Sequence, residues 1–210
     1  MPIDYKKTEK EFYMPKTTPS IIDVPTMTFI MVDGTGNPNT AEAYKTAVEI
    51  LYGLSYSIKM SKKSSFAPDG YFDYVVPPLE GFWWLKDDQS PDFSDKDKYC
   101  WTSMIRQPDF VTSDVFAEAK ASLSKKKPEL DISIARLERF TEGLCAHVMH
   151  IGTYDEEPKT IEGLEHFITE SGYQNDISET RRHHEIYLND PRKVVPEKNK
   201  TVIRHPIRKP

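Results

Sequence analysis

The sequence places an acidic residue, Glu185, inside a segment that otherwise favours a β-strand. The segment runs His183-His184-Glu185-Ile186-Tyr187-Leu188. Because side chains alternate along a strand, Glu185 and Tyr187 share one face and Ile186 and Leu188 take the other, which we expect to be the core side under the helices. A carboxylate beside aromatic rings can bind an organic cation or act as general base on a water. Both roles predict a perturbed pKa for Glu185.

A surface role for Glu185 explains the same spacing equally well. Three basic residues lie close in the sequence and could pair with it in solvent: Arg181, Arg182 and Lys193. The spacing alone leaves both interpretations open.

A second segment, Pro77-Pro78-Leu79-Glu80-Gly81-Phe82-Trp83-Trp84, combines another acid with three large rings. If the segment is extended, Trp83 and Trp84 face opposite ways, so at least one of them is expected on the ligand side. The rings, Phe82 included, would give a flat apolar wall for a planar ligand. Glu80 is a second base or the cap of a turn, and it ranks below Glu185.

Three other patterns that could do chemistry are weaker. His147-x-x-His150 and His183-His184 offer metal ligands, but the two side chains of each pair point to opposite faces of a strand. The alternative is a pair of His150 and His184 from neighbouring strands. The sequence as a whole predicts no metal site. Gly34-Thr35-Gly36 lacks the further residues of a phosphate loop and indicates a strand exit. The spacing of Ser, Cys, His and Asp predicts no nucleophile, and Cys100 and Cys145 are too far apart for a zinc or disulfide framework.

The chain resembles itself in two places, which predicts how these residues are positioned. Phe29–Gly36 and His147–Tyr154 match at a constant offset through Met31/Met149, Gly34/Gly152 and Thr35/Thr153. Each copy continues through a Pro-containing turn into an amphipathic helix and then into segments rich in β-formers. The pattern predicts an α+β fold of two tandem β-α-β-β repeats about a pseudo-twofold axis, with an antiparallel sheet, helices on one face and a ligand cleft on the other.

The local signals give approximate boundaries for these elements. One domain over 1–210 is expected, with repeat one at about 20–105, a connector helix at about 106–127 and repeat two at about 128–210. The predicted details are an Asn39 cap with Glu42, helix ends at Gly53 and Gly172, a connector cap at Ser113 or Asp114, and strands at Tyr71–Val76, Ile132–Ile134, His183–Leu188 and Thr201–Arg204.

Composition excludes several classes of protein. The 210 residues are 38% hydrophobic and 29% charged, with a formal net charge of −5, and the sequence contains neither a membrane-span pattern nor a secretory signal, so we expect a cytoplasmic protein. Residues 181–210 carry nine Lys or Arg against three acids, but apolar residues interleave them, so we expect this stretch to neutralise an acidic body rather than bind nucleic acid. An unpaired sheet edge could pair in a homodimer.

With these segments, the chain resembles GyrI-like proteins of the stand-alone subgroup, which are related to the effector-binding domains of BmrR-type and Rob-type regulators. The resemblance covers nearly the whole chain. It rests on these segments: Pro78–Trp84, Pro108–Val111, Glu142–Cys145, Met149–Pro158 and His183–Pro191.

The resemblance implies a small-molecule partner, no cofactor and a hydrophobic cleft at the pseudo-twofold axis. It also implies hydrolysis of cyclopropane-bearing, DNA-alkylating compounds as a form of cellular protection. Glu185 would orient or deprotonate water, and the aromatic wall would consist of Tyr71, Trp83, Trp84 and Tyr187. The donor to the departing oxyanion would be Tyr71, Tyr187 or His150. Two alternatives remain, a non-catalytic module that binds xenobiotics or cationic drugs, and a gyrase-protecting interaction protein.

Overall fold

A computed structural model describes residues 1–63, 67–86, 95–190 and 193–210. Pro191, the last residue of one family segment, lies outside these ranges. The α-helices are α1 Tyr5–Thr8, α2 Lys10–Tyr13, α3 Glu42–Lys59, α4 Ser113–Lys126 and α5 Glu157–Glu170. The strands are β1 Ser20–Thr35, β2 Leu79–Leu85, β3 Tyr99–Gln107, β4 Arg136–Ile151, β5 Gln174–Asn175, β6 His183–Tyr187 and β7 Lys200–Arg208. Short 3₁₀ turns are η1 Ser61–Lys63, η2 Lys96–Lys98, η3 Ile132–Ile134, η4 Tyr154–Glu156 and η5 Pro196–Lys198.

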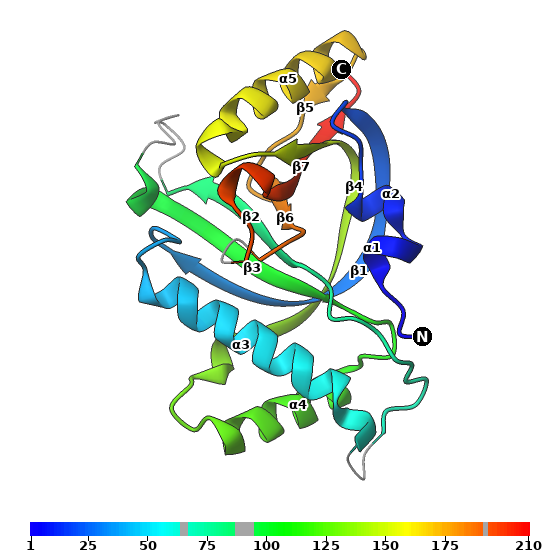
Figure 1. Cartoon of the computed structure of the whole chain (residues 1–210), viewed down its shortest axis with the longest axis vertical. Coiled ribbons are helices and arrows are strands. Elements are labelled where there is room, and N and C mark those ends of the chain that lie inside the picture. Colours follow the sequence, from blue (N-terminus) through cyan, green and yellow to red (C-terminus); the bar gives the residue numbers. More distant parts are fainter. Residues whose placement is uncertain (64–66, 87–94, 191–192) are drawn as a thin grey trace. The chain divides into compact units, whose positions relative to one another are not determined.

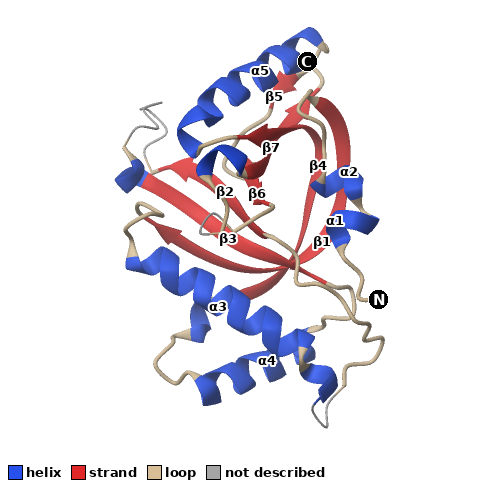
Figure 2. Cartoon of the chain, viewed as in Figure 1, coloured by secondary structure: helices blue, strands red, loops and turns tan. Residues whose placement is uncertain are grey.

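The fold is α+β with an antiparallel sheet, as predicted. The strands hydrogen-bond in the order β4-β1-β3-β2-β6-β7-β5, and an additional β4–β7 pairing closes the sheet on itself (Figure 2). No described helix has the length and apolarity needed to cross a bilayer. The pseudo-twofold repeat and the ligand cleft stay predictions.

The described residues form two compact units. The first comprises Met1–Asp4, Met27–Pro77 and Trp84–Phe140, and the second comprises Tyr5–Thr26, Pro78–Trp83 and Thr141–Pro210. Strands β1, β2 and β4 therefore each run from one unit into the other. The single-domain organisation over 1–210 stays a prediction.

In the first unit, β1 pairs with β3, and α3 contacts both β3 and α4 (Figure 1). The predicted helix end at Gly53 is wrong, because α3 continues to Lys59. Gly53 serves packing instead, since a Cβ there would lie 2.9 Å from Leu123 of α4. The predicted Asn39 cap is also wrong, because α3 begins at Glu42 with Ala41 as its N-cap.

Two predicted strands of this unit are wrong as well. Tyr71–Val76 holds only an isolated bridge between Tyr74 and Ile3, and its rings cluster with Phe110 instead of forming a ladder. Ile132–Ile134 is a 3₁₀ turn, because the Asp131 side chain accepts the Ser133 backbone N–H and bends the chain before β4 begins. The connector helix is confirmed as α4, with Thr112 rather than Ser113 or Asp114 as its cap.

In the second unit, β7 is the central strand and pairs with β4, β5 and β6. The predicted end of α5 at Gly172 is confirmed, where a positive φ of 76° favours glycine. The strand that contains Thr201–Arg204 is longer than predicted.

Both faces of β7 carry helices, which corrects the expectation of helices on one face. Ile203 and Ile207 pack against Leu164 and Ile168 of α5. Val202, on the opposite face, packs in a second cluster with residues of α1, α2, β4 and β6: Tyr5, Tyr13, Met149 and Ile186. The small helices α1 and α2 supply this second cover because each contributes a buried tyrosine.

Candidate functional site

The Glu185 cluster consists of Glu185, His183, Tyr187 and Trp83, all in the second unit. Alternation along β6 puts the first three side chains on one face of the sheet. This face is covered by α5, because the strand partner of Glu185 is Ile203, which packs against that helix, so the expectation that the helices lie only on the Ile186 side is wrong. Glu185 Oε1 lies 2.9 Å from His183 Nε2, and the Tyr187 hydroxyl donates to Glu185 Oε2 at 2.7 Å. The side chain of Glu185 is 14% exposed. A carboxylate with two ordered partners is therefore held almost completely out of bulk solvent.

These partners decide the charge of Glu185. Burial raises its pKa, but the hydrogen bond and charge of His183 and the Tyr187 hydroxyl together hold the pKa below its usual range. The carboxylate form is therefore the resting form at neutral pH. Two of the three basic residues considered as surface partners are engaged elsewhere, since Arg181 pairs with Asp176 and Lys193 with Asp190.

Trp83 reaches the cluster from the neighbouring strand. In the β2–β6 register it lies opposite His183, and its Nε1 donates to the Tyr187 hydroxyl at 2.9 Å. Gly81 lies opposite Glu185, and a Cβ at this position would lie 2.9 Å from Trp83 Nε1. The missing side chain at Gly81 thus makes room for the indole beside the carboxylate.

Replacing Gly81 with Ala is expected to displace the Trp83 indole and break its bond to Tyr187. Overpacking of this kind costs about 1–3 kcal/mol of stability, measurable by urea unfolding, and changes the tryptophan emission. Gly163→Ala on α5 is the control, because nothing lies within 4 Å of the added methyl group and the helix gains about 0.5–1 kcal/mol. Equal stability changes in the two variants would contradict this role of Gly81.

Tyr154 is a site residue that the sequence reasoning missed. Its ring meets the Tyr187 ring edge-on, with centroids 6.3 Å apart. Burial, together with the charges of Glu157 and Glu185, raises the pKa of Tyr154 to about 12. The hydroxyl therefore stays protonated and able to donate. Its position in the Gly152-Thr153-Tyr154 turn of a family segment was the only signal in the sequence.

Two predicted site residues of the second unit, Phe82 and Glu80, do not join the Glu185 cluster. Phe82 and Glu80 lie on the opposite face of β2 from Trp83, where the Phe82 ring packs against His184 with centroids 4.7 Å apart. Tyr71 and Trp84 belong to the first unit, where the Tyr71 hydroxyl donates to the Lys59 carbonyl at 2.7 Å. Their place in an aromatic wall stays a prediction.

His150 has both ring nitrogens engaged, so it is not positioned as a donor to a ligand. Its Nε2 donates to the Thr153 carbonyl at 2.9 Å, and its Nδ1 accepts from the Thr160 hydroxyl at 2.8 Å. These bonds join β4 to the start of α5. The strand registers put His150 and His184 on opposite faces of the sheet, so they cannot hold one metal ion. Within the described ranges, no group of three His, Cys, Asp or Glu residues has the arrangement of a metal site.

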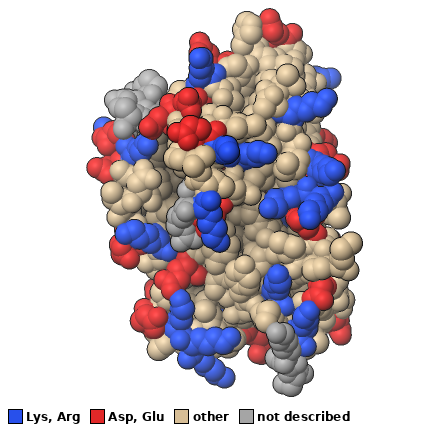
Figure 3. Space-filling model, viewed as in Figure 1, with Lys and Arg blue, Asp and Glu red and all other residues tan. Residues whose placement is uncertain are grey.

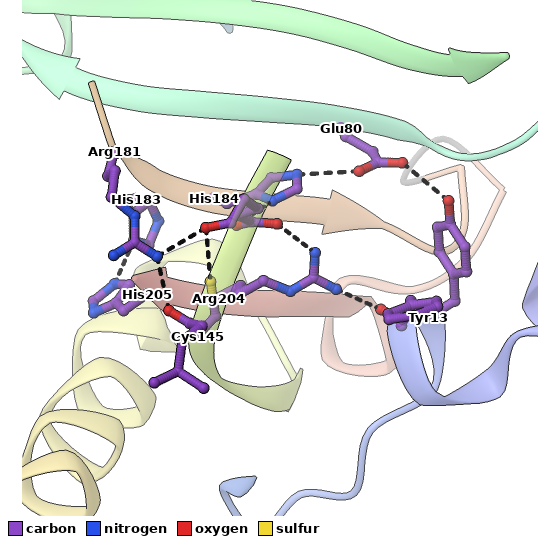
Figure 4. A network of polar contacts seen from close by, with 11 residues as sticks. Tyr13, Glu80, Cys145, Arg181, His183, His184, Arg204 and His205 are labelled. Atoms are coloured by element: carbon purple, nitrogen blue, oxygen red, sulfur yellow. Dashed lines mark hydrogen bonds and ion pairs between the residues drawn. The ribbon is translucent and has the colours of Figure 1, made fainter. Parts of the chain in front are cut away.

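A buried polar network lies on the face opposite Glu185 and consists of Glu80, Glu142, His184 and Arg204 (Figure 4). Glu142 lies 2.7 Å from Arg204 Nη1 and 3.0 Å from His184 Nδ1, while His184 Nε2 lies 3.1 Å from Glu80. The Tyr13 hydroxyl reaches Glu80 at 3.5 Å. Glu80 is thus an ion-pair partner within the network rather than a second base beside Glu185.

Charge within the network is balanced, which explains how it is tolerated in the interior. Burial alone would raise the pKa of Glu142, but Arg204 and His184 lower it to about 2. Burial alone would lower the pKa of His184, but Glu142 and Glu80 raise it above its usual range. Two carboxylates therefore face two cations.

His147 is the strand neighbour of Arg204 and has the opposite titration behaviour. It is 4% exposed, its Nδ1 has no hydrogen-bond partner among the described residues, and burial beside Arg204 lowers its pKa to about 4. Since the unfolded chain binds this proton near pH 6.5, the folded state loses stability as pH falls from 6.5 to 4. We expect His147→Gln to remove about 2–3 kcal/mol of that loss, measured as the difference in unfolding free energy at pH 7 and pH 4.5. An identical loss in the variant would contradict this.

Some basic residues of the C-terminal stretch, residues 181–210, form ion pairs. Arg204 binds Glu142 and Arg181 binds Asp176, and both pairs are within the second unit. On the face shown in Figure 3, Lys and Arg side chains are intermixed with Asp and Glu. The two ion pairs, whose acids lie outside residues 181–210, agree with the expectation that the stretch neutralises acidic residues.

A depression of about 310 Å³ also lies in the second unit. Its lining residues are Thr17, Pro19, Val148, Met149, Ile151, Thr160 and Gly163. The Glu185 cluster is not among them.

Comparison with known proteins assigns the family. The model of the GyrI-like small molecule binding domain matches residues 17–208. No curated protein matches the chain.

Solved structures agree with this assignment. A conserved protein from Listeria innocua is 50% identical over 98% of this chain and 100% of its own, with a TM-score of 0.93. A structure described as a hydrolase from Listeria innocua is also 50% identical, over 98% of this chain and all of its own, with a TM-score of 0.90. The EcmrR C-terminal domain shares the fold at 12% identity, covering 92% of this chain and 98% of its own, with a TM-score of 0.53. The chain belongs to the GyrI-like small molecule binding family.

Proposed function

We propose that this protein binds planar, electrophilic small molecules and hydrolyses them, with Glu185 as the general base. The observation that carries the proposal is a largely buried carboxylate held by His183 and Tyr187 beside the rings of Trp83, Tyr187 and Tyr154. A relative that is 50% identical over 98% of the chain is described as a hydrolase, which supports a hydrolytic reaction.

The substrate class we propose is a cyclopropane conjugated to a dienone, which is a DNA-alkylating group. Ring strain makes the cyclopropane carbon electrophilic. Glu185 accepts a proton as the water oxygen bonds to that carbon, the ring C–C bond breaks, and its electron pair ends on the ketone oxygen as a phenolate. The Tyr154 hydroxyl, which stays protonated, donates to that oxygen. The product no longer alkylates DNA, so the reaction protects the cell.

A direct test is turnover of a spirocyclopropyl-dienone compound in water enriched in ¹⁸O. We expect the wild-type protein to form product catalytically, with one ¹⁸O atom per molecule, faster than the uncatalysed reaction in buffer. Ligand binding is followed through tryptophan emission, since Trp83 touches the cluster. Saturable quenching with no product above the buffer rate would reject the hydrolase proposal.

A binding module is the second candidate, and one observation favours it. The pKa of Glu185 lies below its usual range, and a weaker base is a less effective proton acceptor but a better permanent anion. Such an anion beside aromatic rings suits an organic cation. Tight binding of cationic aromatic compounds, without turnover of the dienone, would support this alternative.

A further inference from the structure

The hydrogen bonding of Glu185 continues beyond His183 to the surface of α5. His183 Nδ1 lies 2.7 Å from His205 Nε2, and His205 Nδ1 lies 2.5 Å from Glu165 Oε1. With the 2.9 Å contact between Glu185 and His183, three consecutive short contacts join two carboxylates through two imidazoles. Figure 4 shows the two histidines side by side. The four residues come from β6, β7 and α5.

Counting hydrogens assigns one positive charge to the two imidazoles that join these carboxylates. Each of the three contacts needs one hydrogen, and ionised carboxylates supply none. A neutral imidazole carries one N–H, so two neutral rings satisfy only two contacts. The third hydrogen makes one ring an imidazolium. The hydrogen-bond geometry therefore requires one proton more than two neutral histidines hold.

The exposed fractions of the four side chains show which end of this series of hydrogen bonds meets solvent. The side chains of Glu185, His183 and His205 are 14%, 15% and 4% exposed, whereas that of Glu165 is 38% exposed. Asn175 Nδ2 donates to Glu165 Oε1 at 2.6 Å and fixes the carboxylate toward His205. Glu165 is thus the member of the chain that meets solvent.

We infer that His183 and His205 share one proton and form a relay between Glu185 and Glu165. The inference rests on the proposed function for its chemical role. His183 keeps its Nε2 proton against Glu185 Oε1 throughout. When Glu185 takes a proton from water on Oε2, His183 passes its Nδ1 proton to His205 Nε2, His205 passes its Nδ1 proton to Glu165, and Glu165 releases it to solvent. One proton thus enters at Glu185 as another leaves at Glu165. Glu185 then gives its proton to the phenolate oxygen of the product, and the histidine pair regains one from solvent through Glu165, which restores the starting state. His183, His205 and Glu165 are positioning and relay residues, not groups that touch substrate.

The pKa directions of Glu185, Glu165 and His205 agree with two ionised carboxylates and a neutral His205 ring. The pKa of Glu185 is lowered by His183, and the pKa of Glu165 is lowered by its bond to His205, each against the effect of burial. Burial lowers the pKa of His205, the hydrogen bond to Glu165 opposes this effect, and the charge of His183 lowers the pKa further. Asn175 of β5 and the strand partners Ala146 of β4 and Trp83 of β2 also lie at the two rings, and none of these three titrates.

The shared proton can be measured by NMR of the histidine ring nitrogens as pH is varied, independently of turnover. In the wild type we expect His183 and His205 to titrate together, with one positive charge between them at pH 7. Glu165→Gln still accepts the His205 N–H but has no charge, so the shared proton should be lost at a pH about one unit lower. The ring-nitrogen signals of His183 should change as well, although Glu165 does not contact His183.

Glu170→Gln is the matched control, because Glu170 lies on the same helix, is 66% exposed and pairs with His166. This variant should change the ring-nitrogen signals of His166 and leave those of His183 and His205 unchanged. Two neutral rings at pH 7, or a His183 titration that is identical in Glu165→Gln and the wild type, would overturn the relay.

Measuring turnover is a second test of the relay. If the wild type hydrolyses the dienone, Glu165→Gln should lower kcat about tenfold without changing KM, and added imidazole buffer should restore it, which a purely structural role would not allow. An unchanged kcat would overturn the relay. A wild type without turnover rejects the proposed function alone, and the NMR result then decides whether the proton is shared.

Discussion

Replacing Glu185 with Gln is expected to lower kcat for the cyclopropyl dienone by about 10²–10⁴-fold, the usual contribution of a positioned general base. The amide keeps the size of the carboxylate and can still accept a hydrogen bond from His183, so the fold should persist. It cannot accept a proton from water. Binding of a neutral planar ligand should stay within a few-fold of the wild-type affinity, measured by tryptophan emission.

Glu179→Gln is the control for this variant, because Glu179 is exposed and lies in the same unit. It should match the wild type in turnover and in binding. Full turnover by Glu185→Gln with intact binding would refute the assignment of the base. Ligands of different charge distinguish the binding module from the hydrolase. If the Glu185 carboxylate serves to bind cations, Glu185→Gln should lose affinity for cationic aromatic compounds and keep its affinity for neutral ones.

Replacing Glu142 with Gln should destabilise the protein by about 3–5 kcal/mol, because removing one partner of a buried pair leaves uncompensated charge. Arg204 and His184 would then face each other's charge across an amide, with only Glu80 as an acidic partner in the network. For a chain of this size the loss corresponds to a fall in Tm of about 10 °C. Urea unfolding followed by circular dichroism measures it.

A second variant keeps this prediction testable if Glu142→Gln does not fold. Adding Arg204→Met removes the unpaired cation, and apolar replacement of a buried ion pair is often close to neutral. The double variant should therefore be more stable than Glu142→Gln alone. Additive losses in the double variant would show that the ion pair is not what stabilises this face of the sheet.

Glu185→Gln and Glu142→Gln probe opposite faces of the same sheet, so their effects should separate. Glu185 and His184 are neighbours on β6 whose side chains point to different sides. Glu142→Gln is expected to lower stability without changing the pH dependence of turnover, measured at a temperature where the variant is folded.

The sequence by itself determined several features of this protein. Alternation over His183–Tyr187 put Glu185 and Tyr187 on one face and Ile186 on the other, and the structure agrees. Helical periodicity located α3, α4 and α5, because apolar residues recur at the spacing of a helix whatever they pack against. The order of the predicted helices and strands indicated the α+β class, and the family segments indicated the GyrI-like assignment.

The tertiary structure alone decided what surrounds Glu185. His205 of β7 and Glu165 of α5 are connected to Glu185 through His183, and the register of β6 against β7 brings the two histidines together. Gly53 was expected to end a helix, but the close approach of Leu123 explains it. Tyr71–Val76 has the composition of a strand, but its rings pack in a cluster instead. Spacing along the chain fixes the side on which a residue points, whereas its partners depend on strand register and helix packing between residues far apart in sequence.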